Sequence, residues 1–301
     1  MSDFTSNFWS VYVAGITLVS ILACALLLWF SGKAKAMTAS DNTTGHVWDG
    51  DLREMNNPLP RWWVWLFVIT IVFGLAYLWM YPGLGASKGS LGWTSVGQHT
   101  TEVAKGDAAV APIYAKFTAM SVEDVARDPQ AKAIGERLFM NNCSQCHGSD
   151  ARGGKGFPNL TDADWLHGGT PDKIKETLAL GRIGNMPPMA AAVGTADDVK
   201  NVANYVLSLS NAPHDSTRAN LGKEKFGACA ACHGADGKGM QAIGAPNLTD
   251  DIWLHGFGEA AVTAMINNGK VNQMPMQANL LTEAQRHVLA AYVWNFSNGA
   301  K

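Results

Sequence analysis

Charged residues are scarce in this sequence of 301 residues, and cysteines are scarcer still. Charged side chains make up 16% of the chain and the formal net charge is −2, which excludes a strongly basic nucleic-acid binder. Five cysteines are too few for a disulfide scaffold in a chain of this length. Hydrophobic residues make up 47%, so the chain can bury a substantial core and disorder is excluded as its dominant state.

Two long stretches lack any charged residue, residues 8–30 and 62–81. An apolar helix of about 20 residues crosses a bilayer core of roughly 30 Å, and aromatic residues bracket both stretches, as is typical at headgroup level. A cleavable signal peptide is the alternative for the first stretch, but the run is too long and no small-residue cleavage site follows Phe30. We therefore expect a membrane anchor over residues 1–81 with two transmembrane helices, 8–30 and 62–81.

Positive charge predicts the orientation of these helices. Residues 1–7 contain no Lys or Arg, whereas the loop between the helices contains Lys33, Lys35, Arg53 and Arg61. Basic loops beside membrane spans remain in the cytoplasm. We expect a cytoplasmic loop, with the N-terminus and everything after Pro82 on the periplasmic side of a bacterial inner membrane.

Residues 82–130 are expected to form a periplasmic linker. The part from Pro82 to Pro112 is rich in Gly, Ser, Thr and Ala and shows no sustained hydrophobic periodicity. Such a composition is typical of a tether without regular structure.

An internal repeat follows the linker. Residues 158–168 read PNLTDADWLHG and residues 246–256 read PNLTDDIWLHG, identical at nine of eleven positions with an offset of 88. Two copies are too few for a solenoid, so we expect two homologous domains, residues 131–212 (the first copy) and 213–301 (the second copy).

Both copies have helix signals and few strand patterns. In the first copy, Thr170, Pro171 and Gly181 mark the cap, first residue and end of a middle helix. A capping box at Thr282 and Gln285 opens the last helix, and Thr195 with Asp198 opens the equivalent helix of the first copy. Domains of about 80 residues are marginal on an apolar core alone, so a covalent cofactor would help to stabilise them.

Four of the five cysteines form two copies of a Cys-x-x-Cys-His pattern. They are Cys143, Cys146 and His147, and then Cys229, Cys232 and His233. This pattern attaches a c-type haem, because two thiols one helical turn apart reach the two vinyl groups while the adjacent imidazole lies under the iron. The fifth, Cys24, lies in the first apolar stretch and is expected to be a packing residue. We therefore expect an all-α chain: two transmembrane helices followed by two tandem class I cytochrome c domains carrying two haem c.

Two other kinds of site share part of this pattern. A thioredoxin-like redox pair requires a β-α-β surrounding and does not explain a His after both copies. A zinc site requires two further Cys or His ligands at each copy. His167 and His255 could supply only one of these two ligands in each copy.

The sixth iron ligand must come from elsewhere, and methionine is a usual choice in haem proteins that carry electrons. Met186 and Met274 each precede a proline at matching places in the repeat. Met189 and Met276 are competitors, but they do not match one another. We expect Met186 and Met274 to be the axial ligands; the sequence leaves open whether each serves its own copy's haem or its neighbour's.

Trp165 and Trp253 recur in the shared segment, each two residues before a histidine, His167 or His255. An indole N–H can donate a hydrogen bond to a haem propionate, and the ring can equally form a wall of the haem pocket. Both tryptophans are therefore expected in the haem pockets, with either role open. The two histidines are weaker candidates for a propionate contact.

Nearly the whole chain resembles the dihaem subunit of the cbb3-type cytochrome c oxidase. The resemblance is carried by two N-terminal spans, a linker, two Cys-x-x-Cys-His domains and, most specifically, the loop segment NNPLPRWW at residues 56–63. It implies an electron-transfer subunit of an oxygen-reducing, proton-pumping oxidase, with no oxygen-reducing site on this chain. The implied partners are a haem-copper catalytic subunit, a monohaem cytochrome c subunit and small membrane subunits, with soluble cytochrome c or the quinol:cytochrome c oxidoreductase as donor.

Two functions from other classes stay open on sequence alone. A free-standing, membrane-tethered dihaem shuttle would share every haem residue. A dihaem peroxidase would need one iron with an open or displaceable ligand, against which the two matched Met-Pro pairs argue.

Overall fold

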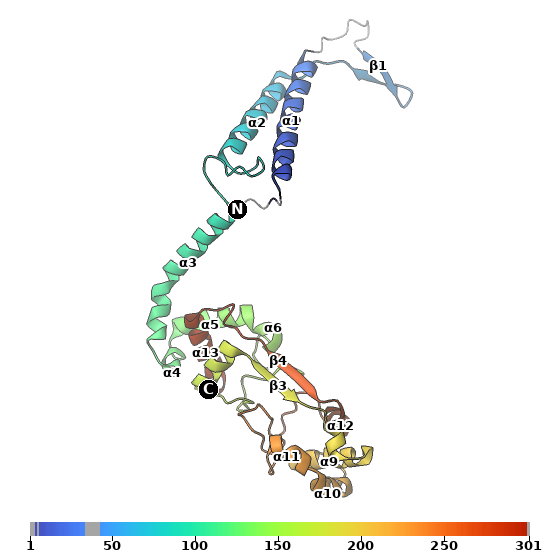
Figure 1. Ribbon diagram of the computed structural model, residues 1–301, viewed down its shortest axis with the longest axis vertical. Helices are drawn as coiled ribbons and strands as arrows, with labels where there is room; N and C mark the ends of the chain where they lie inside the picture. The colour runs from blue at the N-terminus through green and yellow to red at the C-terminus, as the bar shows by residue number, and fades with distance from the viewer. Residues whose placement is uncertain (1–3, 5, 34–42, 300–301) are drawn as a thin grey trace. The chain divides into compact units, whose positions relative to one another are not determined.

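The computed structural model describes residues 4, 6–33 and 43–299. The chain divides into two compact units, Met1–Ala109 and Val110–Lys301, and each is described by itself (Figure 1). Lys35, one of the basic residues used to predict the orientation, lies outside the described residues.

Two long apolar helices form the first unit, α1 (Asn7–Gly32) and α2 (Arg61–Met80). They coincide with the predicted stretches 8–30 and 62–81. Only 6% of the most apolar window of α1 is buried, and none of that of α2, whereas a core helix of a soluble protein would be mostly buried. Both helices are long and apolar enough to cross a membrane, and their exposed apolar side chains need lipid or other subunits around them.

A β-hairpin lies between these helices, made of β1 (Thr43–Trp48) and β2 (Leu52–Met55). Its turn contains Asp49 and Gly50, both at positive φ (50° and 87°), a conformation that Asp-Gly pairs adopt readily in hairpin turns. The expectation of an all-α chain is therefore corrected to a mostly helical one, because the described residues include this sheet and a second two-stranded sheet.

The expected tether contains a helix, α3 (Ser95–Thr118), so the prediction of a segment without regular structure up to Pro112 was wrong. The segment has no proline between residues 95 and 111, and its alanines favour a helix. Only Phe117 is buried along α3, so hydrogen bonds within the helix rather than packing maintain most of its length.

The second unit contains ten helices and two strands within its described residues. They are α4 (Val122–Val125), α5 (Pro129–Asn142), α6 (Ser144–His147), α7 (Pro171–Leu180), β3 (Arg182–Met186), α8 (Ala190–Val193), α9 (Ala196–Leu209), α10 (Ser216–Lys225), α11 (Gly227–His233), α12 (Glu259–Asn268), β4 (Lys270–Met274) and α13 (Glu283–Asn298). The predicted cap at Thr170 is confirmed, as is the helix end at Gly181. Both capping boxes, at Thr195 and Thr282, are also present.

The two copies of the repeat are joined by an antiparallel pair of strands, β3 from the first copy and β4 from the second (Figure 1). The segment that follows each strand packs against the other copy. The backbone N–H of Met189 donates to the carbonyl of Ile266 in α12 (2.8 Å), and that of Gln277 donates to the carbonyl of Leu178 in α7 (2.9 Å). The copies therefore exchange their C-terminal halves.

The hydrophobic cores reflect this exchange. One cluster, the first core, combines α5 and α7 of the first copy with α13 of the second: Phe139, Ile174, Leu178, Leu289, Ala290 and Val293. The other, the second core, combines α9 of the first copy with α11 and α12 of the second: Val199, Val202, Val206, Cys229 and Ile266. Each hydrophobic core therefore contains helices from both sequence copies. The expected boundaries at 131–212 and 213–301 describe the sequence repeat and do not separate the two cores.

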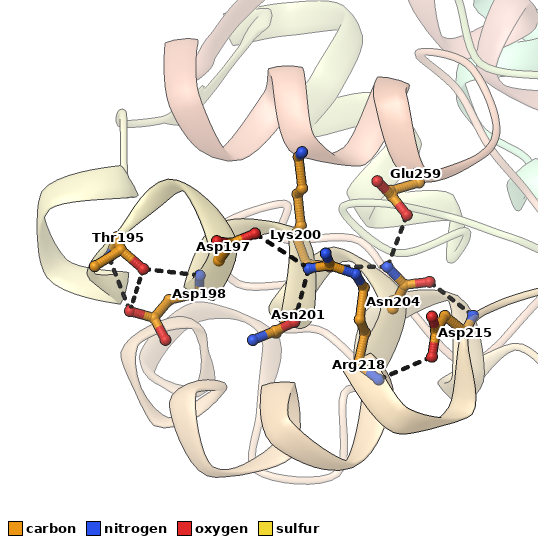
Figure 2. Close-up of polar contacts among 9 residues, drawn as sticks. All are labelled: Thr195, Asp197, Asp198, Lys200, Asn201, Asn204, Asp215, Arg218 and Glu259. Atoms are coloured by element: carbon orange, nitrogen blue, oxygen red, sulfur yellow. Dashed lines mark hydrogen bonds and ion pairs between the residues drawn. The ribbon is translucent and has the colours of Figure 1, made fainter.

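A polar network connects the exchanged helix α9 to its new neighbours (Figure 2). Asn204 on α9 is buried, and its amide nitrogen donates to Glu259 of α12 at 2.9 Å. Its amide oxygen accepts from the backbone N–H of Asp215, the N-cap of α10, also at 2.9 Å. Arg218 of α10 donates to Asn201 and pairs with Asp197, both on α9.

Replacing Asn204 by Ala should lower the free energy of unfolding of the second unit by about 2 kcal/mol, because the Asp215 N–H and the Glu259 carboxylate each lose a partner. Urea unfolding of the purified chain, followed by circular dichroism, measures the change. Lys200→Ala, at an exposed position one turn away on the same helix, should change it by less than about 0.5 kcal/mol. Equal effects of the two substitutions would contradict this account of the network.

Candidate haem sites

The first Cys-x-x-Cys-His segment lies at the end of α5. Cys143 follows the last residue of that helix, and α6 carries the rest of the motif. Cys143 is half-buried and Cys146 exposed, while His147 is buried. Nδ1–H of His147 donates to the carbonyl of Pro158 at 3.0 Å. This bond fixes the tautomer and leaves the lone pair of Nε2 free to bind a metal.

The second segment has the same construction on α11. Cys229 is buried, Cys232 is exposed and His233 is buried. Nδ1–H of His233 donates to the carbonyl of Pro246, again at 3.0 Å. Pro158 and Pro246 are the first residues of the repeated eleven-residue segments. The repeat therefore includes both positions, although the sequence alone assigned no role to either.

The first thiol of each motif lies in apolar surroundings. Burial raises the pKa of the Cys143 thiol to about 11, and the neighbouring Cys146 contributes in the same direction. Burial likewise raises the pKa of Cys229. Within residues 4, 6–33 and 43–299 no group of three or more His, Cys, Asp or Glu is placed to hold a metal ion, so His167 and His255 do not complete a zinc site with either motif.

The thioredoxin alternative fails on the fold. Both sheets of the described chain are two-stranded and antiparallel, so neither supplies a β-α-β unit. Each motif contributes two cysteine side chains and one histidine. The donor set of two thiols and one imidazole with a free Nε2 at each motif therefore fits haem c.

Met186 and Met274 occupy the last positions of β3 and β4, where each strand has crossed to the other copy. Met274 packs against the first core together with Cys143. Met186 pairs with Lys270, beside Gly269 at the end of α12. Of the competing methionines, Met276 is 47% exposed, whereas Met189 packs against the second core.

Trp165 and Trp253 each pack against the same core as the Cys-x-x-Cys-His motif of their own copy. Trp165 packs against the first core and Trp253 against the second. The structure thus gathers Cys143, Trp165 and Met274 around the first core, and Cys229 and Trp253 around the second.

His167 contacts the opposite copy, whereas His255 contacts a strand of its own copy. The ring of His167 lies against Gly244 of the second copy, and Nε2 of His255 lies 2.7 Å from the side-chain amide nitrogen of Asn272 on β4. Burial lowers the pKa of both histidines, and nearby cations, Arg182 for His167 and Lys270 for His255, lower it further. Both rings therefore favour the neutral form.

Loops of the two copies also contact each other directly. The N–H of Gly156, in the first copy, donates to the carbonyl of Leu254 at 2.7 Å. In the second copy, the side-chain amide of Gln241 donates to the carbonyl of Trp165 at 3.2 Å. The segment that follows each haem motif thus contacts the Trp-Leu-His segment of the other copy.

Two family models match the chain. The model described as the N-terminal domain of cytochrome oxidase-cbb3, FixP, matches residues 40–88. The model described as cytochrome C oxidase, cbb3-type, subunit III, matches residues 130–206 and 219–293, which is one match in each copy.

Curated relatives match over most of their length. A Cbb3-type cytochrome c oxidase subunit CcoP from Rubrivivax gelatinosus is 65% identical over 297 residues, 99% of this chain and 97% of the relative. A subunit FixP from Sinorhizobium medicae is 42% identical over 275 residues, 85% of this chain and 94% of the relative. A subunit CcoP from Cereibacter sphaeroides is 37% identical over 276 residues, 85% and 95% of the two chains.

Replacing Gly181 by Ala should destabilise the strand crossing. Gly181 has φ 71°, and a Cβ there would meet the backbone of Met274 and Met276. Strain at positive φ and displacement of that backbone should together cost about 2 kcal/mol. Thermal unfolding checks this against Gly184→Ala, since a Cβ at Gly184 meets no atom within 4 Å. Equal stability of the two variants would refute the close approach at Gly181.

Proposed function

This chain belongs to the cbb3-type cytochrome c oxidase subunit III family, and from that premise we propose that it passes electrons through two haem c groups towards the oxygen-reducing subunit. It is the membrane-anchored electron-transfer subunit of a cytochrome c oxidase. The observation that carries the proposal is the pair of matched motifs in which each histidine is held through Nδ1 with Nε2 free.

The residues divide into two haem sites. In the first haem site, Cys143 and Cys146 bind the vinyl groups and His147 binds the iron. Cys229, Cys232 and His233 do the same in the second haem site. Haem c, when bound, supplies a one-electron ferric/ferrous couple. The chain's own part is to hold each ring by two thioethers and one imidazole, with Trp165 or Trp253 packed beside the motif.

The exchange of halves supports an assignment in which the second ligand of each site would come from the other copy. Met274 and Cys143 both pack against the first core, so we assign the sulfur of Met274 to the first haem site. Met186 lies beside the end of α12 in the second copy, so we assign its sulfur to the second. If one His and one Met held each haem, no ligand position would stay open at either iron, which would suit electron transfer and disfavour the peroxidase alternative.

Partners and topology follow from the family and from charge. The haem-copper subunit, the monohaem cytochrome c subunit and small membrane subunits are the proposed neighbours, with soluble cytochrome c or the quinol:cytochrome c oxidoreductase as electron donor. Helices α1 and α2 are proposed to cross the bacterial inner membrane. Lys33, Arg53 and Arg61 favour a cytoplasmic loop, which puts both haem sites on the periplasmic side. The relatives are oxidase subunits by name, which favours this assembly over a free-standing shuttle.

The purified chain should contain two haems with the pyridine haemochrome spectrum of haem c. It should co-purify with a haem-copper subunit from its native membrane. A double Cys229→Ala, Cys232→Ala variant should retain one covalent haem. One haem per chain in the wild-type protein would contradict the proposal. Isolation of a dihaem chain from its native membrane without any oxidase subunit would also contradict it.

The exchanged methionine ligands have a separate test in that single-haem variant. Met274→Ala should lower the potential of the remaining first haem by on the order of 0.1 V, a modest part of the ~0.8 V range set by axial ligands. Met186→Ala should leave the remaining haem unchanged, and Met276→Ala serves as the exposed control. The reverse pattern in a spectroelectrochemical titration would show that each methionine serves its own copy.

A further inference from the structure

Arg182, the first residue of β3, has a terminal nitrogen that is buried without a partner. Its Nη1 donates to Glu176 at 2.8 Å and its Nε donates to the hydroxyl of Thr177 at 2.9 Å. The third nitrogen, Nη2, is shielded from solvent and has no hydrogen-bond partner among the described residues. The side chain as a whole is only 19% exposed.

An unpartnered donor on a buried guanidinium is costly, because the charged group gives up its hydrogen bonds to water without gaining one in the protein. Thr263 has the other buried unpartnered polar atom of the described chain. A helical threonine hydroxyl can rotate to the carbonyl four residues earlier, whereas Arg182 is already fixed on two sides. Nη2 therefore calls for an acceptor that is not part of the polypeptide, and an anionic one is favoured.

The position of Arg182 indicates which of the two haem sites lies beside it. Arg182 is paired with Met274 across the β3–β4 sheet, and Met274 packs with Cys143 on the first core. Glu176, which holds Nη1, lies on α7, whose Ile174 and Leu178 belong to the same core. Arg182 also contributes to the lowered pKa of His167, close in sequence to Trp165 of that core.

We propose that Nη2 of Arg182 donates a hydrogen bond to a propionate of the haem in the first haem site. Glu176 and Thr177 hold the guanidinium fork in place for this contact. The inference rests on the proposed haem c function and adds a group that binds the non-covalent edge of one ring. A bidentate-capable, permanently charged guanidinium is well suited to a carboxylate.

The second copy lacks this arrangement. At the repeat offset of 88, Arg182 corresponds to Lys270, while Glu176 and Thr177 correspond to Ala264 and Met265. Lys270 is exposed, and neither Ala264 nor Met265 can anchor it by a hydrogen bond or ion pair. A fixed cation beside a propionate disfavours the ferric iron, which carries the extra positive charge, so this contact raises the potential of the first haem alone.

Redox titration of the full chain in its oxidase complex tests the contact, with the first haem identified as the component that moves in Met274→Ala. In Arg182→Gln, the ferric-to-ferrous ratio of that haem at fixed ambient potential should rise about tenfold, or about 59 mV for a one-electron couple. The other haem should not shift. Lys270→Gln, the matched control, should leave the first haem unchanged.

Two further variants separate a propionate contact from a structural role. Glu176→Gln removes the ion pair but keeps the guanidinium charge, so it should not lower the first haem's potential. Arg182→Lys retains a charge without the fork, so it should shift the potential less than Arg182→Gln. The propionate bending mode of the first haem in resonance Raman spectra should nevertheless change in both Arg182 variants.

The proposal is overturned if Arg182→Gln leaves both potentials and the Raman mode unchanged. It is also overturned if Glu176→Gln lowers the first potential as much as Arg182→Gln does, since Arg182 would then only brace α7. Either result with two haems per chain would leave the electron-transfer function standing. If Arg182→Gln does not accumulate, an unchanged Raman mode in Arg182→Lys refutes the contact.

Discussion

The antiparallel pairing of β3 with β4 is the constraint on which the rest of the haem-bearing unit depends. Five consecutive residue pairs, from Arg182 with Met274 to Met186 with Lys270, hold two extended segments that each carry the chain about 16 Å at roughly 3.3 Å per residue. Each strand starts at the end of one copy's middle helix and ends beside the other's. Because the pairing is antiparallel, β3 and β4 cross between the copies at the same place and in opposite directions.

The crossing makes stability a property of the pair of copies. Each hydrophobic core takes its last helix, α13 or α9, from the opposite copy, and α13 also packs against the end of α3 and against α4. A domain of about 80 residues gains little from a core of its own. Sharing the helices means that neither copy can lose its core without opening the other, and polar contacts such as Asn204 with Glu259 fix the exchanged helix α9 in one orientation.

Local signals in the sequence predicted most of the elements and few of the long-range contacts. The apolar stretches and the helix caps at Thr170, Thr195 and Thr282 follow from short patterns. The hairpin turn at Asp49 and Gly50 was readable in principle but was outweighed by the helical signals around it. The exchange could not be predicted, because homologous copies present nearly equivalent surfaces and α9 or α13 suits either core. The metal-ligand roles of the motif residues and methionines remain predictions.

The exchange also changes what a single copy of the repeat means. Residues up to 212 supply the first motif, but they supply neither α13 of the first core nor Met274, which packs against the same core as Cys143. The second motif likewise depends on α9 from the first copy. Each core, and with it the surroundings of each motif, is thus built from two sequence copies. Arg182 and Lys270 occupy equivalent places at opposite ends of the β3–β4 pair, so the two sites acquire different surroundings although their motifs are the same.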